Sequence, residues 1–164
     1  MAAITLQLCS SNNTAQIAAL AKTIWNQHYR SIIAQEQIDY MLATMYNHQS
    51  LLQQMQEKKH LLYFVVADEA VIGFMSVNEQ SAGKWFLNKF YIDQTLAAKG
   101  IGTAAFEAVI KLHAIKYIEL TVNRQNYKAI NFYFKNGFKI KEVADFDIGN
   151  GYFMNDFVMV RAFD

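Results

Sequence analysis

The stretch Lys99-Gly100-Ile101-Gly102-Thr103 separates a strand-like run from a long helical pattern. Two glycines at such a junction let the backbone approach a ligand closely, because they carry no Cβ. The first amides of the following helix have no intrahelical partner and lie at the positive end of the helix dipole. Together these features predict an anion site, and hence a phosphate-bearing ligand.

The segments on either side of this stretch alternate between helical and extended patterns. An apolar stripe over residues 101–112 predicts an amphipathic helix directly after the glycines. A second helix begins at Tyr127 and ends at Gly137, which suits a left-handed C-cap. Towards the N-terminus, Asp68 and Glu69 join two β-rich runs as a hairpin. The predicted strands occupy residues 4–8, 61–67, 71–77, 84–92, 117–122, 139–146 and 152–160.

The N-terminal third of the chain adds further helical patterns. Caps at residues 11–13 precede a helix that reaches His28, and residues 38–45 predict a second one. Ser50 is a candidate cap for a short further helix through Glu57, which the predicted order βααβββαβαββ leaves out. This order describes an α/β (α+β) fold, with a mixed, mostly antiparallel sheet and helices on both faces.

Two features of the strands bear on packing. Trp85, Leu87 and Tyr91 alternate along their strand, which predicts that they share one face. Gly73 follows the predicted hairpin, where a glycine indicates a bulge or a close approach of another backbone.

Length and composition narrow the class of protein. The 164 residues predict a single domain, 1–164, and no apolar run is long enough to cross a bilayer. The single cysteine, Cys9, excludes an internal disulfide and suits a reducing compartment, so we expect a cytoplasmic protein without a signal peptide. The formal net charge of +1 argues against nucleic acid or an anionic membrane as the main partner. No spacing of His, Cys or carboxylates predicts a metal site.

The glycine stretch also fits a dinucleotide fingerprint. Residues 100–105 match G-x-G-x-x-A, and Glu119 follows about twenty residues later, as that motif requires. The connection over residues 93–99, however, separates the preceding strand from the glycines, and three antiparallel-looking strands come before it. An NAD-binding module therefore stays open as the weaker interpretation.

A second motif lies in the segment Asn126-Tyr127-Lys128-Ala129-Ile130-Asn131-Phe132-Tyr133-Phe134-Lys135-Asn136-Gly137-Phe138. With the glycine stretch it resembles the GNAT superfamily of acyl-CoA-dependent N-acetyltransferases, in which Arg/Gln-x-x-Gly-x-Gly is followed by Asn-x-x-Ala-x-x-x-Tyr-x-x-x-Gly-Phe. The chain departs from this pattern at Ala97, which occupies the Arg/Gln position, and at Ala98, where glycine is common. Residues 91–92, 120–123 and 151–159 are more loosely similar to bacterial polyamine acetyltransferases of the PaiA type.

The resemblance implies an acetyl-CoA-dependent N-acetyltransferase with a defined set of site residues. Tyr133 would protonate the leaving thiolate, although by spacing alone it fits a core aromatic equally well. The first helices would form the acceptor wall with Trp25 and Tyr29, near His28, although these side chains also fit core positions. The implied acetyl-CoA-binding residues are Phe90, Tyr91, Ile92, Ala97, Ala98, Lys99, Gly100, Ile101, Gly102, Thr103, Asn126, Ala129 and Tyr133.

The chemistry leaves the proton acceptor open. A primary amine has a pKa of about 10.4 and must lose a proton before it attacks a thioester. Glu119, on the strand beside the expected thioester, is one candidate, and Glu79, Asp93 or a chain of water molecules are others.

The acceptor and the assembly also stay open. The acceptor is expected to be a small amine, first a polyamine, or a protein amino terminus, and Glu36 and Asp39 are the nearby acidic pair for a polycation. The loss of a side chain at Ala97 raises a second possibility, a CoA-binding sensor with little turnover. The apolar run over residues 153–160 could support a homodimer.

Overall fold

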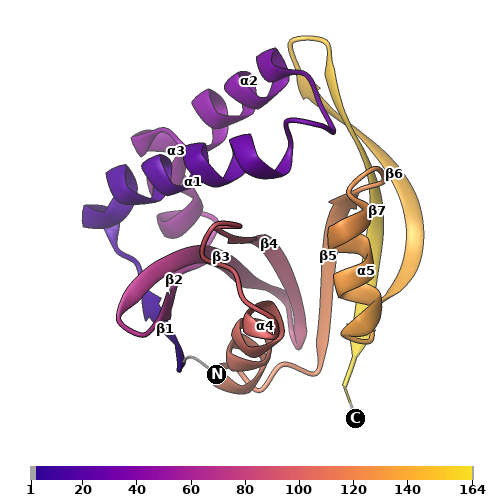
Figure 1. The fold of residues 1–164 in the computed structure, drawn as a ribbon. Helices are drawn as coiled ribbons and strands as arrows, with labels where there is room; N and C mark the ends of the chain where they lie inside the picture. The colour runs from indigo at the N-terminus through magenta and orange to yellow at the C-terminus, as the bar shows by residue number, and fades with distance from the viewer. Residues whose placement is uncertain (1–2, 164) are drawn as a thin grey trace.

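The computed structural model describes residues 3–163 as a seven-stranded sheet with helices on both faces (Figure 1). The strand order is β1-β2-β3-β4-β5-β7-β6, and only the β4–β5 pair is parallel. Within residues 3–163, no helix combines the length and the apolar character that crossing a bilayer requires. The elements are β1 (Ile4–Leu8), a 3₁₀ turn (Ser11–Asn13), α1 (Thr14–His28), α2 (Gln35–Met45), α3 (His48–Gln56), β2 (Leu61–Ala67), β3 (Ala70–Ser81), β4 (Lys84–Ile92), α4 (Ile101–Leu112), β5 (Tyr117–Asn123), α5 (Tyr127–Lys135), β6 (Lys139–Gly149) and β7 (Tyr152–Ala162).

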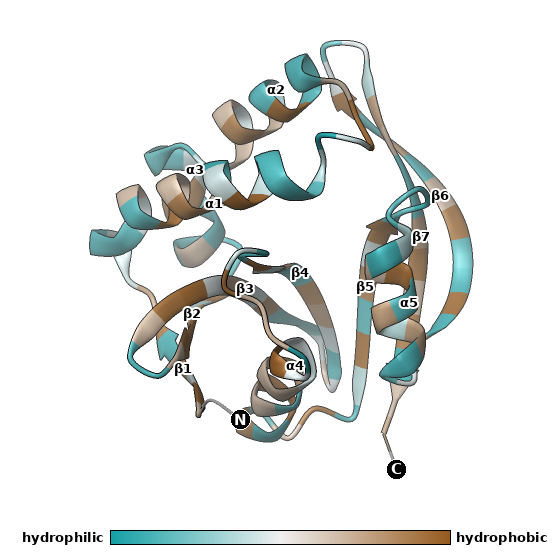
Figure 2. Cartoon of the chain, in the orientation of Figure 1, coloured by the Kyte–Doolittle hydropathy of each residue, from teal (hydrophilic) through white to brown (hydrophobic). Residues whose placement is uncertain are grey.

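Each face of the sheet has its own hydrophobic core, because alternate strand residues point to opposite faces. Leu62 and Phe64 of β2 pack with helices α1–α3, whereas Tyr63 and Val65 pack on the face that carries α4 and α5. Figure 2 shows hydrophilic residues on the outer sides of α1 and α2 and hydrophobic ones along β2. Burial of apolar surface on both sides therefore fixes the sheet between two helical layers.

The predicted mixed α/β class is confirmed, with one more helix than the predicted order contains. The short helix after α2 is a full element, α3, and its cap is Asn47 rather than Ser50. The Asn47 side chain accepts a hydrogen bond from the Ser50 amide at 2.8 Å, so Ser50 already lies inside the helix. The hairpin between β2 and β3 turns at Asp68 and Glu69, both with positive φ, as the sequence predicts.

The C-terminal strands are longer than predicted and form a hairpin that includes the sheet edge. β6 extends to Gly149 and β7 to Ala162, so each is an eleven-residue strand. The predicted dimer segment, 153–160, lies in β7, whose two edges are already paired with β5 and β6. The edge strand at this end of the sheet is β6, so 153–160 is not itself an edge strand, and a homodimer through this run stays a prediction.

β4 leaves its neighbour β5 part of the way along its length. The two strands pair only from Trp85 to Leu87 on β4, although β4 continues to Ile92. A β-bulge lies at this point: Leu87 pairs with Val77 and Lys89 with Ser76, so Asn88 is an extra residue. Because a bulge bends its strand, β4 diverges from β5 beyond Leu87, and the two strands form the open V in Figure 1.

The same bulge overturns one prediction about side-chain direction. Trp85 and Leu87 pack in the α4 core, but Tyr91 packs in the core beneath α1–α3. One inserted residue reverses the alternation of every following side chain. The predicted common face of Trp85, Leu87 and Tyr91 is therefore wrong, and Lys89 and Tyr91 both line the α1–α3 side.

Gly73 lies where β3 passes closest to β4. A Cβ at this position would be 2.2 Å from the Tyr91 carbonyl oxygen, a backbone atom that no rotamer change can move. The predicted close approach at Gly73 is confirmed, and it holds the free end of β4 in place.

We expect Gly73→Ala to lower the free energy of unfolding by about 3 kcal/mol, because β4 must shift to admit the methyl group. Gly83→Ala is the matched control, since Gly83 has positive φ but nothing within 4 Å of its added Cβ. The control should lose only about 1 kcal/mol of backbone strain. Urea unfolding of the three proteins measures both values, and equal losses would show that the contact with Tyr91 is not the cause.

Candidate active site

The divergence of β4 from β5 opens a cavity of about 410 Å³ between the end of β4 and helices α4 and α5. We call it the α4–α5 cavity. Its walls are the last residues of β4, the loop that leads to α4, the first turn of α4, and α5. The lining residues are His28, Phe90, Ile92, Gln94, Ala97, Ala98, Lys99, Gly100, Ile101, Gly102, Thr103, Asn126, Lys128, Ala129, Phe132 and Tyr133.

The first turn of α4 presents free amides to this cavity. Gly100 has φ +86°, a left-handed conformation that glycine adopts without strain, and it turns the loop into the helix. Within residues 3–163, the amides of Gly102 and Thr103 make no hydrogen bond to the protein. Gly102 also lies against Phe132, where a Cβ would be 3.0 Å from Cε2. Unpaired amides at the positive end of a helix dipole can bind an anion at this end of the cavity.

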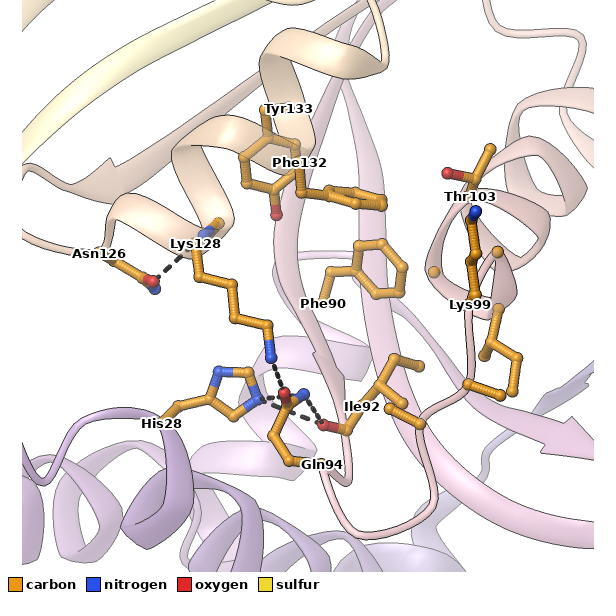
Figure 3. Close-up of a pocket in the computed structure, with 16 residues that line it drawn as sticks. His28, Phe90, Ile92, Gln94, Lys99, Thr103, Asn126, Lys128, Phe132 and Tyr133 are labelled. Carbon is orange, nitrogen blue, oxygen red and sulfur yellow. Dashed lines mark hydrogen bonds between the residues drawn. The ribbon is translucent and has the colours of Figure 1, made fainter.

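The opposite side of the α4–α5 cavity is bridged by side chains from three elements (Figure 3). The Lys128 ammonium of α5 donates to the Gln94 side-chain oxygen, and the Gln94 amide donates to the Ile92 carbonyl at 3.1 Å. His28 Nε2 of α1 lies 3.2 Å from the same carbonyl. Burial lowers the pKa of His28, so the imidazole is neutral at neutral pH and Nε2 can donate to Ile92. Lys128 adds a positive charge opposite the amides of α4.

A second cavity, of about 250 Å³, lies on the other side of β4 beneath α1 and α2, and we call it the α1–β7 cavity. Aromatic rings form much of its wall, among them Trp25, Tyr29, Tyr46 and Tyr91. The hydroxyls of Tyr29 and Tyr91 are 3.0 Å apart. Contacts between α2 and the β6–β7 hairpin hold this side of the fold together, including the Tyr40 hydroxyl, which donates to the Ile148 carbonyl at 2.8 Å.

Tyr133 of α5 lines both cavities, together with His28, Phe90, Asn126 and Ala129. Its hydroxyl points from α5 into the space beside Phe90 (Figure 3). Burial, and secondarily the nearby Tyr29, raise the pKa of Tyr133 above its ordinary value. The phenol is therefore protonated at neutral pH, and it lies where a group held in one cavity would meet a group held in the other.

Asp156 of β7 is a buried carboxyl group in the α1–β7 cavity. The residue is 4% exposed, and Oδ1 has no hydrogen-bond partner within residues 3–163. Burial raises the pKa of Asp156 to about 6, against the smaller lowering effects of the Thr121 hydroxyl and the Arg124 guanidinium. A carboxylate with a pKa of about 6 and a free oxygen can accept a proton at neutral pH.

The structure brings nearly all of the predicted acetyl-CoA-binding residues to the α4–α5 cavity. Tyr91 is the exception: the bulge turns its side chain into the α1–β7 cavity. Trp25 and Tyr29 line the α1–β7 cavity as well. Sequence reasoning missed Gln94, Lys128 and Phe132 of the α4–α5 cavity, and also Lys89 and Asp156 of the α1–β7 cavity.

The three carboxylates predicted as proton acceptors lie outside both cavities. Glu119 accepts from the Tyr117 hydroxyl at 3.2 Å and pairs with Lys141 at 3.4 Å. Glu79 accepts from the Gly83 amide in the β3–β4 turn, and Asp93 accepts from Thr95 and Gln27. Each carboxylate is already occupied by local partners, so the structure does not bring Glu119 to an acceptor.

The other ionisable residues that the sequence singles out lie away from both cavities. Glu36 and Asp39 of α2 are exposed and line neither cavity. Residues 3–163 contain no cluster of three or more His, Cys, Asp or Glu side chains that could hold a metal ion. His113, at the end of α4, bonds to the Tyr63 hydroxyl at 2.8 Å, away from both cavities.

Comparison with known proteins supports the same motifs. The model of the acetyltransferase (GNAT) family matches residues 16–138. The curated spermidine N(1)-acetyltransferase of Thermoplasma acidophilum is 26% identical over an alignment of 168 positions, which covers 98% of each chain.

Solved structures extend the likeness over almost the whole chain. The PaiA N-acetyltransferase of Thermoplasma acidophilum, solved in complex with coenzyme A, has a TM-score of 0.78 at 26% identity and covers 98% of this chain and 99% of its own. A GCN5-related N-acetyltransferase from Rhodopseudomonas palustris has the same fold, with a TM-score of 0.81 at 16% identity and coverage of 99% and 97%. With the family model matched over most of its length, this chain belongs to the GNAT family of acetyltransferases, whose acetyl donor is acetyl-CoA.

Proposed function

We propose that this protein transfers the acetyl group of acetyl-CoA to a primary amine by direct attack on the thioester. The observation that carries the proposal is the position of Tyr133, a buried and protonated phenol at the junction of two cavities. One cavity offers amides and lysines to a phosphate-bearing donor, and the other offers an aromatic wall and a carboxylate to an amine.

The α4–α5 cavity suits acetyl-CoA. The pyrophosphate would accept hydrogen bonds from the free amides of Gly102 and Thr103, with Lys99 adjacent in the lining. The pantetheine amides would pair with β4 over residues 90–92, where β4 has no partner on its β5 side. Ala97 removes one side-chain contact to the pyrophosphate, but the main-chain donors of α4 do not depend on it.

The α1–β7 cavity would receive the amine. An ammonium ion has no lone pair, so a base must remove a proton before the nitrogen attacks. Asp156 is the base that we propose, because its unpartnered Oδ1 lies in the cavity and its pKa of about 6 leaves it ionised at neutral pH.

The reaction then needs one proton donor. The amine nitrogen bonds to the carbonyl carbon of the thioester while a backbone amide of β4 stabilises the charge on oxygen. The carbon–sulfur bond breaks, and the Tyr133 hydroxyl gives its proton to the departing thiolate. Formation of the amide releases a second proton from the nitrogen, which restores the Tyr133 phenol, and Asp156 passes the first proton to solvent, so the protons balance.

A second candidate function is that of a CoA-binding sensor with little turnover. The small side chain of Ala97, at a position where the family has Arg or Gln, favours it. The acceptor of the enzyme would be a small amine or a protein amino terminus, and the name of the curated relative places spermidine first among the amines to test.

Acetyl-CoA should bind the purified protein in the micromolar range, and NAD should not bind, because the α4 amides and the unpaired edge of β4 match a pantetheine pyrophosphate. Calorimetric titration with each ligand measures this. NAD binding with no acetyl-CoA binding would return the glycine stretch to the dinucleotide interpretation.

Tyr133→Phe should lower turnover about 10²-fold, because the leaving thiolate loses its proton donor. Affinity for acetyl-CoA should stay within about twofold of the wild type, since the ring is retained. Tyr127→Phe, on the exposed first residue of the same helix, is the matched control and should leave both values unchanged. Thiol release measures turnover, and an unchanged rate in Tyr133→Phe would make Tyr133 a packing residue.

Asp156→Asn should lower turnover about 10²-fold and remove the rise in rate that the wild type shows as pH passes about 6. The pKa of Asp156 is higher in the folded state than its ordinary value of 3.8, so folding favours the protonated form. The wild type should therefore lose stability relative to Asp156→Asn between about pH 4 and pH 7. Denaturant unfolding across this range measures the difference, and parallel stability curves would contradict the raised pKa.

A further inference from the structure

Lys89 is a buried ammonium group in the wall of the α1–β7 cavity. The residue is 6% exposed, and its Nζ lies 5.2 Å from the centre of the Tyr46 ring. The bulge at Asn88 is the reason that Lys89 points to this side of the sheet at all. A lysine in this position is unusual, because lysine side chains are rarely buried without a partner.

No anionic group within residues 3–163 neutralises Lys89. The side chain forms no ion pair within residues 3–163. Burial is the main cause that lowers the pKa of Lys89 to about 8, and the positive charge of Lys58 lowers it further. Lys89 in turn lowers the pKa of His60, so the ionisable groups that interact with Lys89 are basic. Lys89 is thus still charged at neutral pH, and a buried charge without a counter-ion is costly. A ligand that supplies an anion would remove this cost.

Uncharged donors accompany Lys89. The Tyr46 hydroxyl and Trp25 Nε1 are both buried and have no hydrogen-bond partner within residues 3–163. Their rings are in contact, with centroids 5.6 Å apart, and both side chains line the α1–β7 cavity. Burial raises the pKa of Tyr46 well above its ordinary value, so the hydroxyl keeps its proton. Lys89, Tyr46 and Trp25 therefore all offer hydrogen-bond donors to one region.

Asp156 marks a different part of the same cavity. Its negative charge contributes to raising the pKa of Tyr29, and Tyr29 in turn contributes to raising that of Tyr133. Asp156 and Lys89 form no ion pair with each other, since no ammonium–carboxylate contact between them lies within 4.0 Å. The α1–β7 cavity thus holds a carboxylate, Asp156, and an ammonium, Lys89 beside Tyr46, that do not pair with each other.

We propose that the acceptor is a small amine that also carries a carboxylate, with its amine at Asp156 and Tyr133 and its carboxylate at Lys89. This inference rests on the proposed acetyl transfer and names the class of acceptor for that reaction. The C–N bond forms at the amine, and the carboxylate takes no part in the chemistry.

A polyamine fits this cavity poorly. Its second ammonium group would enter a space that already holds the Lys89 charge, and like charges at close range disfavour binding. Asp156 is the only Asp or Glu in the described lining of the α1–β7 cavity, and the acidic pair Glu36 and Asp39 is exposed on α2. The acceptor cavity of this chain therefore differs in charge from what a polycation requires.

The test compares acceptors of equal length that differ only in the charge of the far group. Glycine, β-alanine and γ-aminobutyrate are each compared with the diamine and the simple alkylamine of similar length. For γ-aminobutyrate these are putrescine and butylamine. The best amino carboxylate should exceed its diamine at least about 30-fold in kcat/KM. Lys89→Met should lower kcat/KM for that amino carboxylate by a similar factor, mainly through KM, and should leave the alkylamine within about twofold.

Lys58→Met is the matched control, because it removes the same charge from an exposed side chain near Lys89. It should leave all three acceptor classes unchanged. Lys89→Met should fold, since replacing a buried charge by an apolar chain of similar length is often neutral or stabilising. Urea unfolding and acetyl-CoA affinity, both at wild-type values, would confirm this.

The outcomes separate the two proposals. Diamines or spermidine acetylated faster than every amino carboxylate, with no effect of Lys89→Met, would overturn the acceptor class and leave the acetyl transfer standing. Calorimetric binding of an amino carboxylate to the protein with CoA, lost in Lys89→Met but without acetylation of any amine, would overturn the acetyl transfer and support the ligand class. Absence of both binding and turnover for every amino carboxylate would also overturn the acceptor class.

Discussion

The extra residue Asn88 in β4 is the constraint on which the rest of the site depends. It ends the pairing of β4 with β5 after Leu87 and leaves the last part of β4 without a partner on that side. Both cavities lie along this unpaired segment, one on each side of it. Because the core packs against both faces of the sheet, the two strands cannot close again without losing the contacts of α4 and α5 on one face or of α1–α3 on the other.

Burial gives the charged and polar groups of the site their chemical character. The phenol of Tyr133 stays protonated because its anion would be poorly solvated, and Asp156 holds a pKa of about 6 for the same reason. Lys89 keeps its charge in an enclosed space, with no counter-ion in the part of the chain that the structure describes. Such groups are costly to a fold, and they are concentrated here at the cavity where the acceptor is proposed to bind.

Local signals in the sequence predicted much of the fold. The strands, the hairpin at Asp68 and Glu69, and the helices after Gly100 and Asn126 depend on turn chemistry and periodicity within a few residues. Where prediction failed, distant packing or a competing local signal decided the outcome. Asn47 rather than Ser50 begins α3, and the β6–β7 hairpin runs further because α2 packs against it through Gln37 and Tyr40.

The sequence by itself determined the α4–α5 cavity, where acetyl-CoA is proposed to bind, because this cavity is built from contiguous motifs. Gly100, Gly102, Asn126 and Tyr133 lie at fixed spacings, and the helices that carry them converge on one cavity. Only the tertiary structure decided the α1–β7 cavity, where the acceptor is proposed to bind. Asp156 and Lys89 come from separate strands, and one inserted residue reverses the face to which a strand residue points. Alternation alone therefore could not show that Lys89 lines the cavity, or that Glu119 is held by Lys141 instead.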